Sequence, residues 1–589
     1  MKKRILFALP LVALTAGLVS GCSNKSNANK AQTIYLEYFN KSGFGRAWLD
    51  NMISDWKAAT SYSNFDVVVV PTSYLGGDQV TQVQSGTSLT DIFFGSNPEY
   101  KTGFYLNDGK GYFEDLSDVA NSSAYGETKL IKDKIANYET TWKEVGGKQV
   151  YDSASDTITT SGMYLLPYTS TFTAPIFNYD DWVEKGLLTE ASASDEVKAT
   201  LAAEGITYHE QKVGSTTKLI FDSATFSASY AEGDVIMSAG KDGKFGTYDD
   251  GQPVTYSEFQ TLYSKLLTQY TNTCITSDAG CYNENLVLAS LAQINGIEGY
   301  NALAKFDSEG KEVTLSDGTK EVITLQNGNH AYKIGGVKTA MDFFYTYFLD
   351  SKSGYTQVEL NVGDAQAKYC NGLSDSNHSV AMIYEGNWFE NQAKDRLATA
   401  TKNHPNNHLG KLDLRYLMIP NFDGQRGIDG KGNGTCLTAD EYGSIAVTNQ
   451  TDATKLAAIK DLLKFFLSDT QLAKATCSSG IAFAYDYTLT DAQLDSMAPS
   501  QKYAYQIMHD TDNVRILTQT TDKVASPMYF GASLGSTAII RAGKNGSYAS
   551  PYGYMKTGTT QGFADDFANT YTDAKWDSLV SEMKNYIKK

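Results

Sequence analysis

The sequence has 589 residues, of which 20% are charged and 41% are hydrophobic, and its net charge is −17. A chain of this length and composition is globular and divides into two or more domains. Its acidic balance repels nucleic acid and anionic lipid headgroups, so we expect neither as a partner.

The first 32 residues resemble the start of a bacterial lipoprotein. A positive segment at 2–4 precedes an apolar stretch at 5–18 that is short for a transmembrane span. The stretch closes on Val-Ser-Gly-Cys at 19–22, which resembles a lipobox, in which Cys22 is lipidated and becomes the first residue. We expect 1–21 to be a removed signal peptide and 22–32 a flexible tether. An ordinary signal peptide that contains a cysteine is the alternative.

A strand, a helix and a strand follow the tether. Residues 33–39 alternate as a strand does, 46–59 carry a one-sided apolar face, and 65–70 is a β-branched run typical of a strand buried on both faces. This order predicts a βαβ unit in a parallel sheet, and 89–94 is a third strand.

Two loops leave these strands at the carboxyl edge of the sheet, where open α/β sheets bind ligands. The first loop contains Asn40, Lys41 and Phe44, and the second contains Ser96 and Asn97. Neither matches a phosphate-binding glycine pattern, so we expect no nucleotide there.

The middle of the chain alternates apolar elements with polar segments. Residues 169–173 are small and polar, as expected of a crossing between two lobes, and 191–251 is a charge-mixed insertion. Within it, Asp242, Asp249 and Asp250 are a weak calcium candidate because the EF-hand pattern is absent. A glycine-rich turn with solvated carboxylates is the simpler interpretation.

Five cysteines follow the lipobox, an odd number. Cys274 and Cys281 are near enough in sequence to form a disulfide, which an extracytoplasmic compartment permits, and the pairing stays open. No metal-ligand cysteine spacing occurs, so we expect no zinc site and no cofactor.

Residues 379–389 form a buried strand that breaks at Gly386 and presents Trp388. A glycine followed by an aromatic residue places that ring at the rim of a sheet, where we expect it to stack on a ligand. Packing between the lobes is the competing role for Trp388. Later, 414–420 predicts a second crossing, Asp452 caps an amphipathic helix, and 526–531 is an aromatic loop.

The order of five motifs resembles a known family. They are the lipobox, the βαβ start, Gly-Met-Tyr-Leu-Leu-Pro-Tyr at 162–168, Phe-Asn-Tyr-Asp-Asp-Trp at 177–182 and Ala-Met-Ile-Tyr-Glu-Gly-Asn-Trp at 381–388. Together they resemble the extracellular solute-binding proteins of family 1, carbohydrate-binding lipoproteins of ABC importers related to maltose-binding protein. The resemblance runs from about Thr33 to the C-terminus.

This resemblance implies an α/β, two-lobed type II periplasmic-binding-protein fold with a ligand cleft between the lobes. We expect an N-terminal lobe of 33–172 and 421–500, and a C-terminal lobe of 173–420 and 501–589, with insertions near 190–250 and 300–335. The implied protein is a non-enzymatic monomer, lipid-anchored on the extracytoplasmic side of the cell membrane. It captures a carbohydrate and delivers it to the permease subunits of an ABC transporter. The many aromatic side chains favour an oligosaccharide over a single sugar.

The family's tryptophan matches Trp388, which implies that this residue stacks on the sugar. The other candidate ligand-binding residues are Asn40, Lys41, Phe44, Phe94, Ser96, Asn97, Tyr168, Phe172, Tyr282, Glu385, Tyr529 and Phe530.

Two other classes of function remain as alternatives. A surface glycoside hydrolase needs two carboxylates facing each other across the cleft, and Glu385 has no identifiable partner in the sequence. A binding lipoprotein for a non-sugar solute such as a peptide suits the length of the chain but not the order of its motifs.

Overall fold

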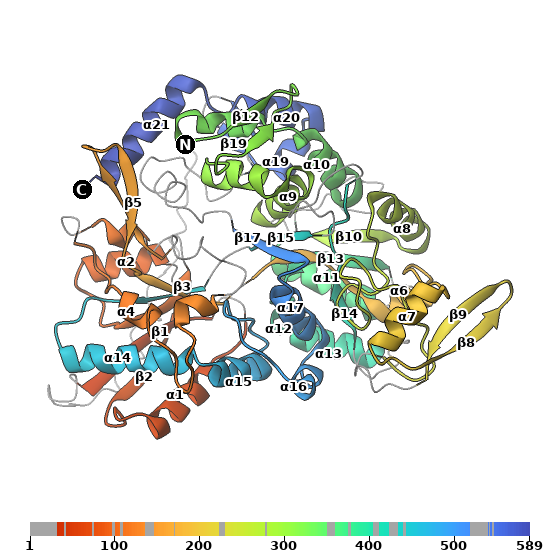
Figure 1. Ribbon diagram of the computed structural model, residues 1–589, viewed down its shortest axis with the longest axis horizontal. Coiled ribbons are helices and arrows are strands. Elements are labelled where there is room, and N and C mark those ends of the chain that lie inside the picture. The colour runs from red at the N-terminus through yellow and green to blue at the C-terminus, as the bar shows by residue number, and fades with distance from the viewer. Residues whose placement is uncertain are drawn as a thin grey trace, which may run out of the picture.

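In the computed structural model, the description covers residues 32–40, 43–72, 76–96, 101–106, 110–135, 146–169, 171–222, 230–276, 280–349, 360–374, 379–404, 412–422, 434–439, 443–518, 540, 542–544 and 547–588. The predicted lipobox lies outside this part of the chain. Figure 1 shows two α/β lobes, each built on its own main sheet, which confirms the predicted fold class.

The N-terminal lobe is built on a five-stranded sheet in the order β2-β1-β3-β16-β6. Its strands are β1 (Thr33–Phe39), β2 (Asp66–Thr72), β3 (Ile92–Ser96), β6 (Leu165–Thr169) and β16 (Gly443–Val447). The predicted βαβ unit is present, because β1 pairs in parallel with both β2 and β3. β16 runs antiparallel to its two neighbours.

The prediction that the second strand is buried on both faces is wrong. β2 is an edge strand, and its side chains alternate, with Val68 41% and Val70 39% exposed. Pro71 fits this position, because proline lacks the N–H that a central strand would use.

One-sided helices cover the N-terminal sheet, as their apolar spacing predicts. α1 (Ala47–Ala59) buries Trp48, Met52 and Trp56, and Asp452 caps α14 (Ala453–Phe466) through the amides of its first turn. The indole N–H of Trp56 donates to Asp461 Oδ2 at 2.9 Å, which ties these two helices together.

The C-terminal lobe is built on a four-stranded sheet in the order β10-β13-β7-β14. Its strands are β7 (Thr173–Asn178), β10 (Asn272–Thr276), β13 (Val380–Gly386) and β14 (Leu414–Tyr416). β10 and β13 are parallel, and β7 is antiparallel to β13 and β14. The main helices of this lobe are α8 (Tyr256–Gln269), α9 (Gly280–Lys305), α10 (Val337–Phe344), α11 (Val362–Ser374) and α13 (Lys394–Asn403).

The remaining elements are shorter and decorate or connect the two sheets. They are α2 (Gly76–Gln84), η2 (Lys101–Phe104), α4 (Ser117–Ala120), η3 (Ile131–Lys134), β4 (Lys148–Asp152), β5 (Thr157–Ser161), α6 (Tyr179–Glu184), α7 (Asp195–Ala203), β8 (Tyr208–Val213), β9 (Thr216–Phe221), β11 (Glu312–Thr314), β12 (Lys320–Val322), η5 (Leu325–Lys333), η6 (Tyr345–Leu349), α12 (Phe389–Gln392), β15 (Thr435–Ala439), α15 (Asp469–Ser479), α16 (Asp491–Ser496), α17 (Pro499–His509), β17 (Val514–Thr518), β18 (Ala542–Lys544), β19 (Ser547–Ala549), α19 (Pro551–Met555), α20 (Thr560–Ala568) and α21 (Asp573–Tyr586).

The chain crosses between the lobes first between β6 and β7, as predicted from residues 169–173. The second crossing does not follow β14. Phe422 stacks on Tyr256 at the start of α8, and β15 packs on α9, so this stretch still belongs to the C-terminal lobe. The chain returns to the N-terminal sheet between β15 and β16, later than the predicted boundary at 420/421.

Two large hydrophobic clusters fill the molecule. One lies within the C-terminal lobe and includes Trp182, Phe343 and Trp576. The other runs from Phe94 in the N-terminal lobe across the crossing to Tyr369 under the C-terminal sheet. The two lobes therefore share a continuous apolar core beside the crossing.

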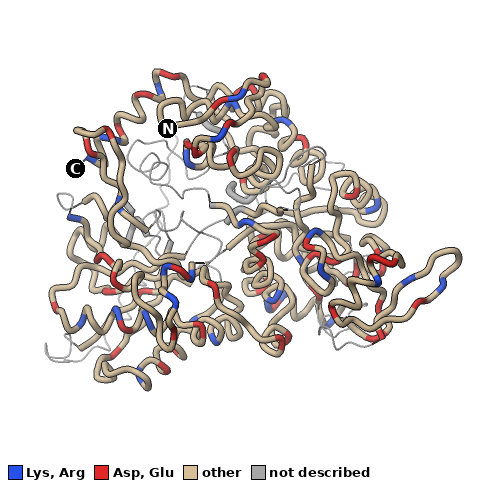
Figure 2. Tube along the Cα trace, viewed as in Figure 1, with Lys and Arg blue, Asp and Glu red and all other residues tan. Residues whose placement is uncertain are grey.

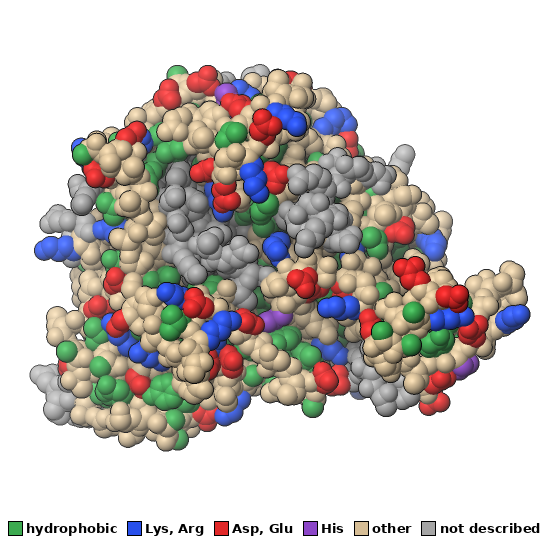
Figure 3. All heavy atoms as spheres, viewed as in Figure 1, with side chains coloured by type: hydrophobic (Ala, Val, Ile, Leu, Met, Phe, Trp, Pro, Cys, Tyr) green, Lys and Arg blue, Asp and Glu red, His purple; other side chains and the backbone are tan. Residues whose placement is uncertain are grey.

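Charge is distributed over both lobes. Figure 2 shows Lys and Arg interspersed with Asp and Glu along the described chain, and Figure 3 shows the same mixture on the surface in that view. Among the described residues, no helix combines the length and the hydrophobicity that crossing a bilayer requires.

Candidate functional site

The strand ends of both sheets meet at the first crossing. In the N-terminal sheet, Gly443 pairs with Ser96 at the end of β3 and with Thr169 at the end of β6. In the C-terminal sheet, Thr173 at the start of β7 pairs with Gly386 at the end of β13. Because only residues 170–172 separate these two pairings, the carboxyl edges of the two sheets adjoin, where α/β folds place ligands.

The turn after β13 is bound directly to the crossing. The backbone N–H of Asn387 donates to the carbonyl oxygen of Phe172 at 3.0 Å, and the N–H of Phe172 donates to Asn387 Oδ1 at 3.4 Å. Phe172 is fully buried with its ring edge against Tyr416, 4.9 Å between centroids. Burial also raises the pKa of the Tyr416 hydroxyl well above its usual range, so this hydroxyl stays neutral.

Trp388 follows in the same turn, and its indole lies against the backbone of Gly386. A Cβ at Gly386 would approach Trp388 Cζ2 to 2.3 Å, so only glycine leaves room for the ring. Trp388 is 4% exposed and packs with the core of the C-terminal lobe. The structure therefore places this ring at the predicted rim of the sheet, covered rather than open.

A buried polar cluster that the sequence did not reveal lies beside this turn. Asn285 Nδ2 donates to Thr173 Oγ1 at 3.1 Å, and the hydroxyls of Thr173 and Tyr384 lie 3.2 Å apart. These residues come from α9, β7 and β13. Two features of the sequence could have indicated this cluster. Thr173 ends the predicted crossing, and Asn285 lies one helical turn after the candidate Tyr282.

Glu385 points into the lobe and not to solvent. It is fully buried, its Oε1 accepts the N–H of Gly386 at 3.1 Å, and its Oε2 accepts from Gln366 Nε2 at 3.5 Å. Gln366 also donates to Gln392 Oε1 at 2.9 Å. Glu385 thus supports the turn from inside through α11 and α12.

The loop after β1 reaches α12 from the N-terminal lobe. A Cβ at Gly43 would lie 3.3 Å from Gln392 Cγ, and half-buried Phe44 packs against both hydrophobic clusters. Asn40 is exposed, and its Oδ1 accepts the N–H of Gly45 at 3.2 Å. The loop therefore approaches α12 through Gly43 and Phe44, whereas the hydrogen bond of Asn40 stays within the loop.

Phe94 and Tyr168 lie in the core of the N-terminal lobe. Phe94 is 1% exposed and meets the ring of Tyr168 at 5.0 Å and that of Phe466 at 5.5 Å. Tyr168 is also buried. Their ring contacts are packing contacts within that core.

Several candidate residues lie outside the described part of the chain. Lys41, Asn97, Tyr529 and Phe530 are among these, as is Cys22. For Ser96 and Tyr282 the description covers only the backbone, at the end of β3 and in the first turn of α9.

The calcium candidate is a hydrogen-bonded turn. Asp249 Oδ2 accepts the N–H groups of Lys241 at 2.6 Å and Asp242 at 3.1 Å, and Asp250 accepts from the hydroxyl of Tyr230 and the N–H of Gly246. Burial and the charge of Asp249 raise the pKa of Asp242 to about 9. The described residues contain no group of three or more His, Cys, Asp or Glu placed to hold a metal ion. Asp249 and Asp250 are fully buried and Asp242 is half-buried, so the carboxylates are not solvated as the simpler interpretation expected.

The predicted pairing of Cys274 with Cys281 is not seen at Cys274, and the side chain of Cys281 lies outside the described part of the chain. Cys274 is a free thiol in β10, where its side chain is buried in the C-terminal core and donates to the carbonyl oxygen of Ile275 at 3.6 Å. Its strand position points the thiol into the lobe, and burial raises its pKa well above the usual range.

A separate pocket lies in the insertion. It has a volume of about 340 Å³ and is lined by Thr189, Glu190, Ala191, Ser192, Glu196, Val197, Thr200, Ser238, Ala239, Gly243 and Phe245. None of these residues belongs to the crossing or to the turn after β13.

The comparisons with known proteins give structural likenesses only. No family model matches the sequence, and no curated protein matches it. The apo form of RafE from Streptococcus pneumoniae is similar at 14% identity over 96% of this chain and 100% of that one, with a TM-score of 0.47. The cyclic alpha-maltosyl-1,6-maltose binding protein from Arthrobacter globiformis is similar at 13% identity over 94% and 99%, with a TM-score of 0.44.

A third similar structure is a probable secreted solute-binding lipoprotein from Streptomyces coelicolor. It is 10% identical over 94% of this chain and 98% of that one, with a TM-score of 0.47.

Proposed function

We propose that this chain is the carbohydrate-binding component of an ABC importer and that it works without catalysis. It captures a sugar, by preference an oligosaccharide, between its two lobes and delivers it to the permease subunits in the membrane. The observation that carries the proposal is the junction of the two sheet edges at residues 169–173, where the turn Gly386 to Trp388 is hydrogen-bonded to the crossing.

The chemistry of this junction suits a sugar. A pyranose has apolar C–H faces, which an indole or a phenyl ring covers, and a polar equator, which hydroxyl and amide groups bind. Trp388 and Phe44 supply the rings, and Asn387, Thr173 and Asn285 supply hydroxyl and amide groups. Lys41, Ser96, Asn97, Tyr282, Tyr529 and Phe530 remain proposed contacts on the basis of the sequence.

Trp388 is covered in the structure, so ligand entry requires movement. Two-lobed binding proteins admit a ligand by hinge motion, and the transporter then reads the closed form. We propose that separation of the lobes uncovers the indole and that closure over a sugar covers it again.

The proposed location is the outer face of the cell membrane. Acylation of Cys22 after removal of 1–21 would anchor the protein, and two acyl chains hold a protein on a bilayer where one is marginal. Metabolic labelling with palmitate tests this point, since Cys22→Ala removes the acceptor thiol and is expected to abolish the label.

Isothermal titration calorimetry against a panel of mono- and oligosaccharides and short peptides tests the main proposal. Binding heat from one class of sugar, with the sugar recovered unchanged from the calorimeter cell, supports sugar capture. Release of shorter sugars would favour the hydrolase, heat from peptides alone would favour a peptide-binding protein, and a flat panel of sugars would contradict the proposal.

A further inference from the structure

The two lobes meet a second time, away from the crossing. Figure 1 shows the hairpin β4–β5 of the N-terminal lobe extending to the end of α21, the last helix of the chain. Figure 2 shows charged residues of both signs where they meet.

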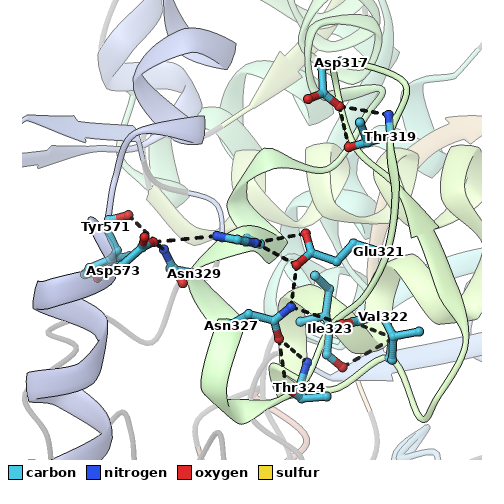
Figure 4. Close-up of polar contacts among 12 residues, drawn as sticks. Asp317, Thr319, Glu321, Val322, Ile323, Thr324, Asn327, Asn329, Tyr571 and Asp573 are labelled. Atoms are coloured by element: carbon cyan, nitrogen blue, oxygen red, sulfur yellow. Dashed lines mark hydrogen bonds and ion pairs between the residues drawn. The ribbon is translucent and has the colours of Figure 1, made fainter.

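α21 belongs to the C-terminal lobe. The indole N–H of Trp576 donates to the carbonyl oxygen of Leu325 at 2.7 Å, and its ring meets Phe306 at 4.8 Å. At the start of the helix, Asn329 Nδ2 donates to Asp573 Oδ1 at 2.8 Å (Figure 4). The first half of α21 is thus fixed to the insertion around η5.

The β4–β5 hairpin belongs to the N-terminal lobe. At its base, the carbonyl oxygen of Gly146 accepts the N–H of Tyr164 at 2.6 Å and the N–H of Leu165 at 3.2 Å. Leu165 is the first residue of β6, and Tyr164 directly precedes it. Tyr105 packs on the N-terminal lobe and exchanges hydrogen bonds of 3.1 Å with the backbone N–H and the side chain of Gln149 in β4.

The residues that follow α21 form a β-bridge with this hairpin. The N–H of Tyr151 donates to the carbonyl oxygen of Ile587 at 2.8 Å, and Tyr151 forms a parallel bridge with Lys588. The rings of Tyr105 and Tyr586 lie 5.0 Å apart. Lys584 Nζ pairs with Asp156 Oδ1 at 2.6 Å and lies 5.0 Å from the centre of the Tyr151 ring.

This junction is small compared with the crossing. On the crossing side the lobes share a continuous apolar core. Here the described residues share one backbone hydrogen bond, the Tyr105–Tyr586 ring pair and the contacts of Lys584, and half-buried side chains of the hairpin pack at the edge of the C-terminal cluster. The ion pair is partly solvated, with the Asp156 side chain 64% exposed, so water and salt weaken it. Such a contact can break and re-form without disturbing either core.

We propose that residues 584–588 and the β4–β5 hairpin form a latch between the lobes, opposite the hinge side. When the latch is engaged, the lobes are held together at two separate places and the junction at Trp388 stays covered. When it is released, the lobes separate about the crossing. Its role in ligand capture rests on the function proposed above, but the latch itself is a property of the ligand-free protein.

The test uses the ligand-free mature chain and compares three variants. The first ends after Tyr586 and so lacks the bridging residues Ile587 and Lys588. The second, Asp156→Asn with Lys584→Gln, keeps the whole chain and its backbone contacts and removes the ion pair together with the contact of Lys584 with the Tyr151 ring, so it serves if the shortened chain does not fold. The control, Lys575→Gln, changes an exposed lysine on the other half of α21.

Two measurements read the latch. Hydrogen exchange of peptides covering β4 reports on the Tyr151 amide, and small-angle X-ray scattering gives the radius of gyration. We expect exchange at Tyr151 to accelerate by at least about tenfold in the shortened chain and by less in the double variant. The radius of gyration should be larger than that of the wild type in both variants. The control should change neither quantity.

Unchanged exchange and an unchanged radius of gyration in the folded variants would overturn the latch. Because no sugar is present, this result is independent of the calorimetric panel. No binding heat from any sugar in the panel would contradict sugar capture and leave the latch proposal intact. Variants that bind sugar but show unchanged exchange and an unchanged radius of gyration would contradict the latch proposal alone.

Discussion

Asn387 and Phe172 exchange two hydrogen bonds, although 215 residues separate them in the sequence. Phe172 lies in the crossing and Asn387 in the turn that ends β13, so this pair fixes the position of Trp388 relative to the hinge. The amide of Asn387 is 3% exposed, which makes its oxygen a costly group to leave without a donor.

Removing this amide should weaken sugar binding. Asn387→Ala deletes the oxygen that accepts from the Phe172 N–H, and we expect a loss of about 1 kcal/mol in unfolding free energy together with weaker binding. Asn387→Asp keeps an oxygen acceptor and should lose less affinity. Urea denaturation and calorimetry check both variants, and equal behaviour of the two would argue against the role given to this hydrogen bond.

Trp388 tests the stacking role directly. Trp388→Ala should weaken binding of the sugar by about 1–3 kcal/mol while the protein still folds, because an aromatic platform is lost. Trp388→Phe keeps a smaller ring and should retain part of the affinity. Calorimetry with circular dichroism as the folding check decides this, and an unchanged affinity of Trp388→Ala would show that the indole only packs.

Substitution of Gly386 should weaken sugar binding as much as substitution of Trp388 does. A Cβ there would approach the indole to 2.3 Å, so Gly386→Ala must displace the ring or the strand, at a cost of about 1–3 kcal/mol in stability. Gly363→Ala is the matched control, because in α11 the new Cβ would meet only Asn361 Oδ1 at 3.3 Å. Equal affinity and stability in the two variants would contradict the close approach.

Local patterns predicted the elements whose partners are near in sequence. The apolar face of α1 and the Asp452 cap of α14 are both present, because each pattern lies within a few helical turns. The α/β class followed from the βαβ order for the same reason. The edge position of β2 was missed, since a run of valines does not reveal whether a helix covers both faces.

The candidate site was predicted less completely, because its contacts join distant segments. Trp388 was placed at the correct strand end, but its burial depends on the fold of the whole lobe. Phe94 follows a strand as a ligand residue would, yet Tyr168 and Phe466 enclose it. The cluster of Thr173, Asn285 and Tyr384 joins three elements, so no single stretch of sequence reveals it.

The aspartate turn in the insertion predicts a pH dependence of stability. Burial and the charge of Asp249 raise the pKa of Asp242 to about 9, so the folded protein holds a proton that the unfolded chain releases near its ordinary pKa of 3.8. The unfolded state therefore binds fewer protons between these values, and stability falls as pH rises, by at most about 1.4 kcal/mol per pH unit for this group.

Asp242→Asn mimics the protonated carboxyl and should remove this slope. We expect the variant to gain stability relative to the wild type between about pH 6 and about pH 8, measured by urea denaturation. Asp317→Asn, in an exposed turn, is the control and should not change the slope. Parallel pH curves for the wild type and Asp242→Asn would contradict the raised pKa.

The central claim is that a sugar binds where the two sheet edges meet. Hydrogen exchange measured with and without the sugar that gives heat in calorimetry tests it most directly. We expect protection of residues 384–389 and of the loop 40–45 in the opposite lobe, with no change around the insertion pocket lined by Thr189 and Phe245. Protection confined to that pocket, or no protection at either edge, would contradict it.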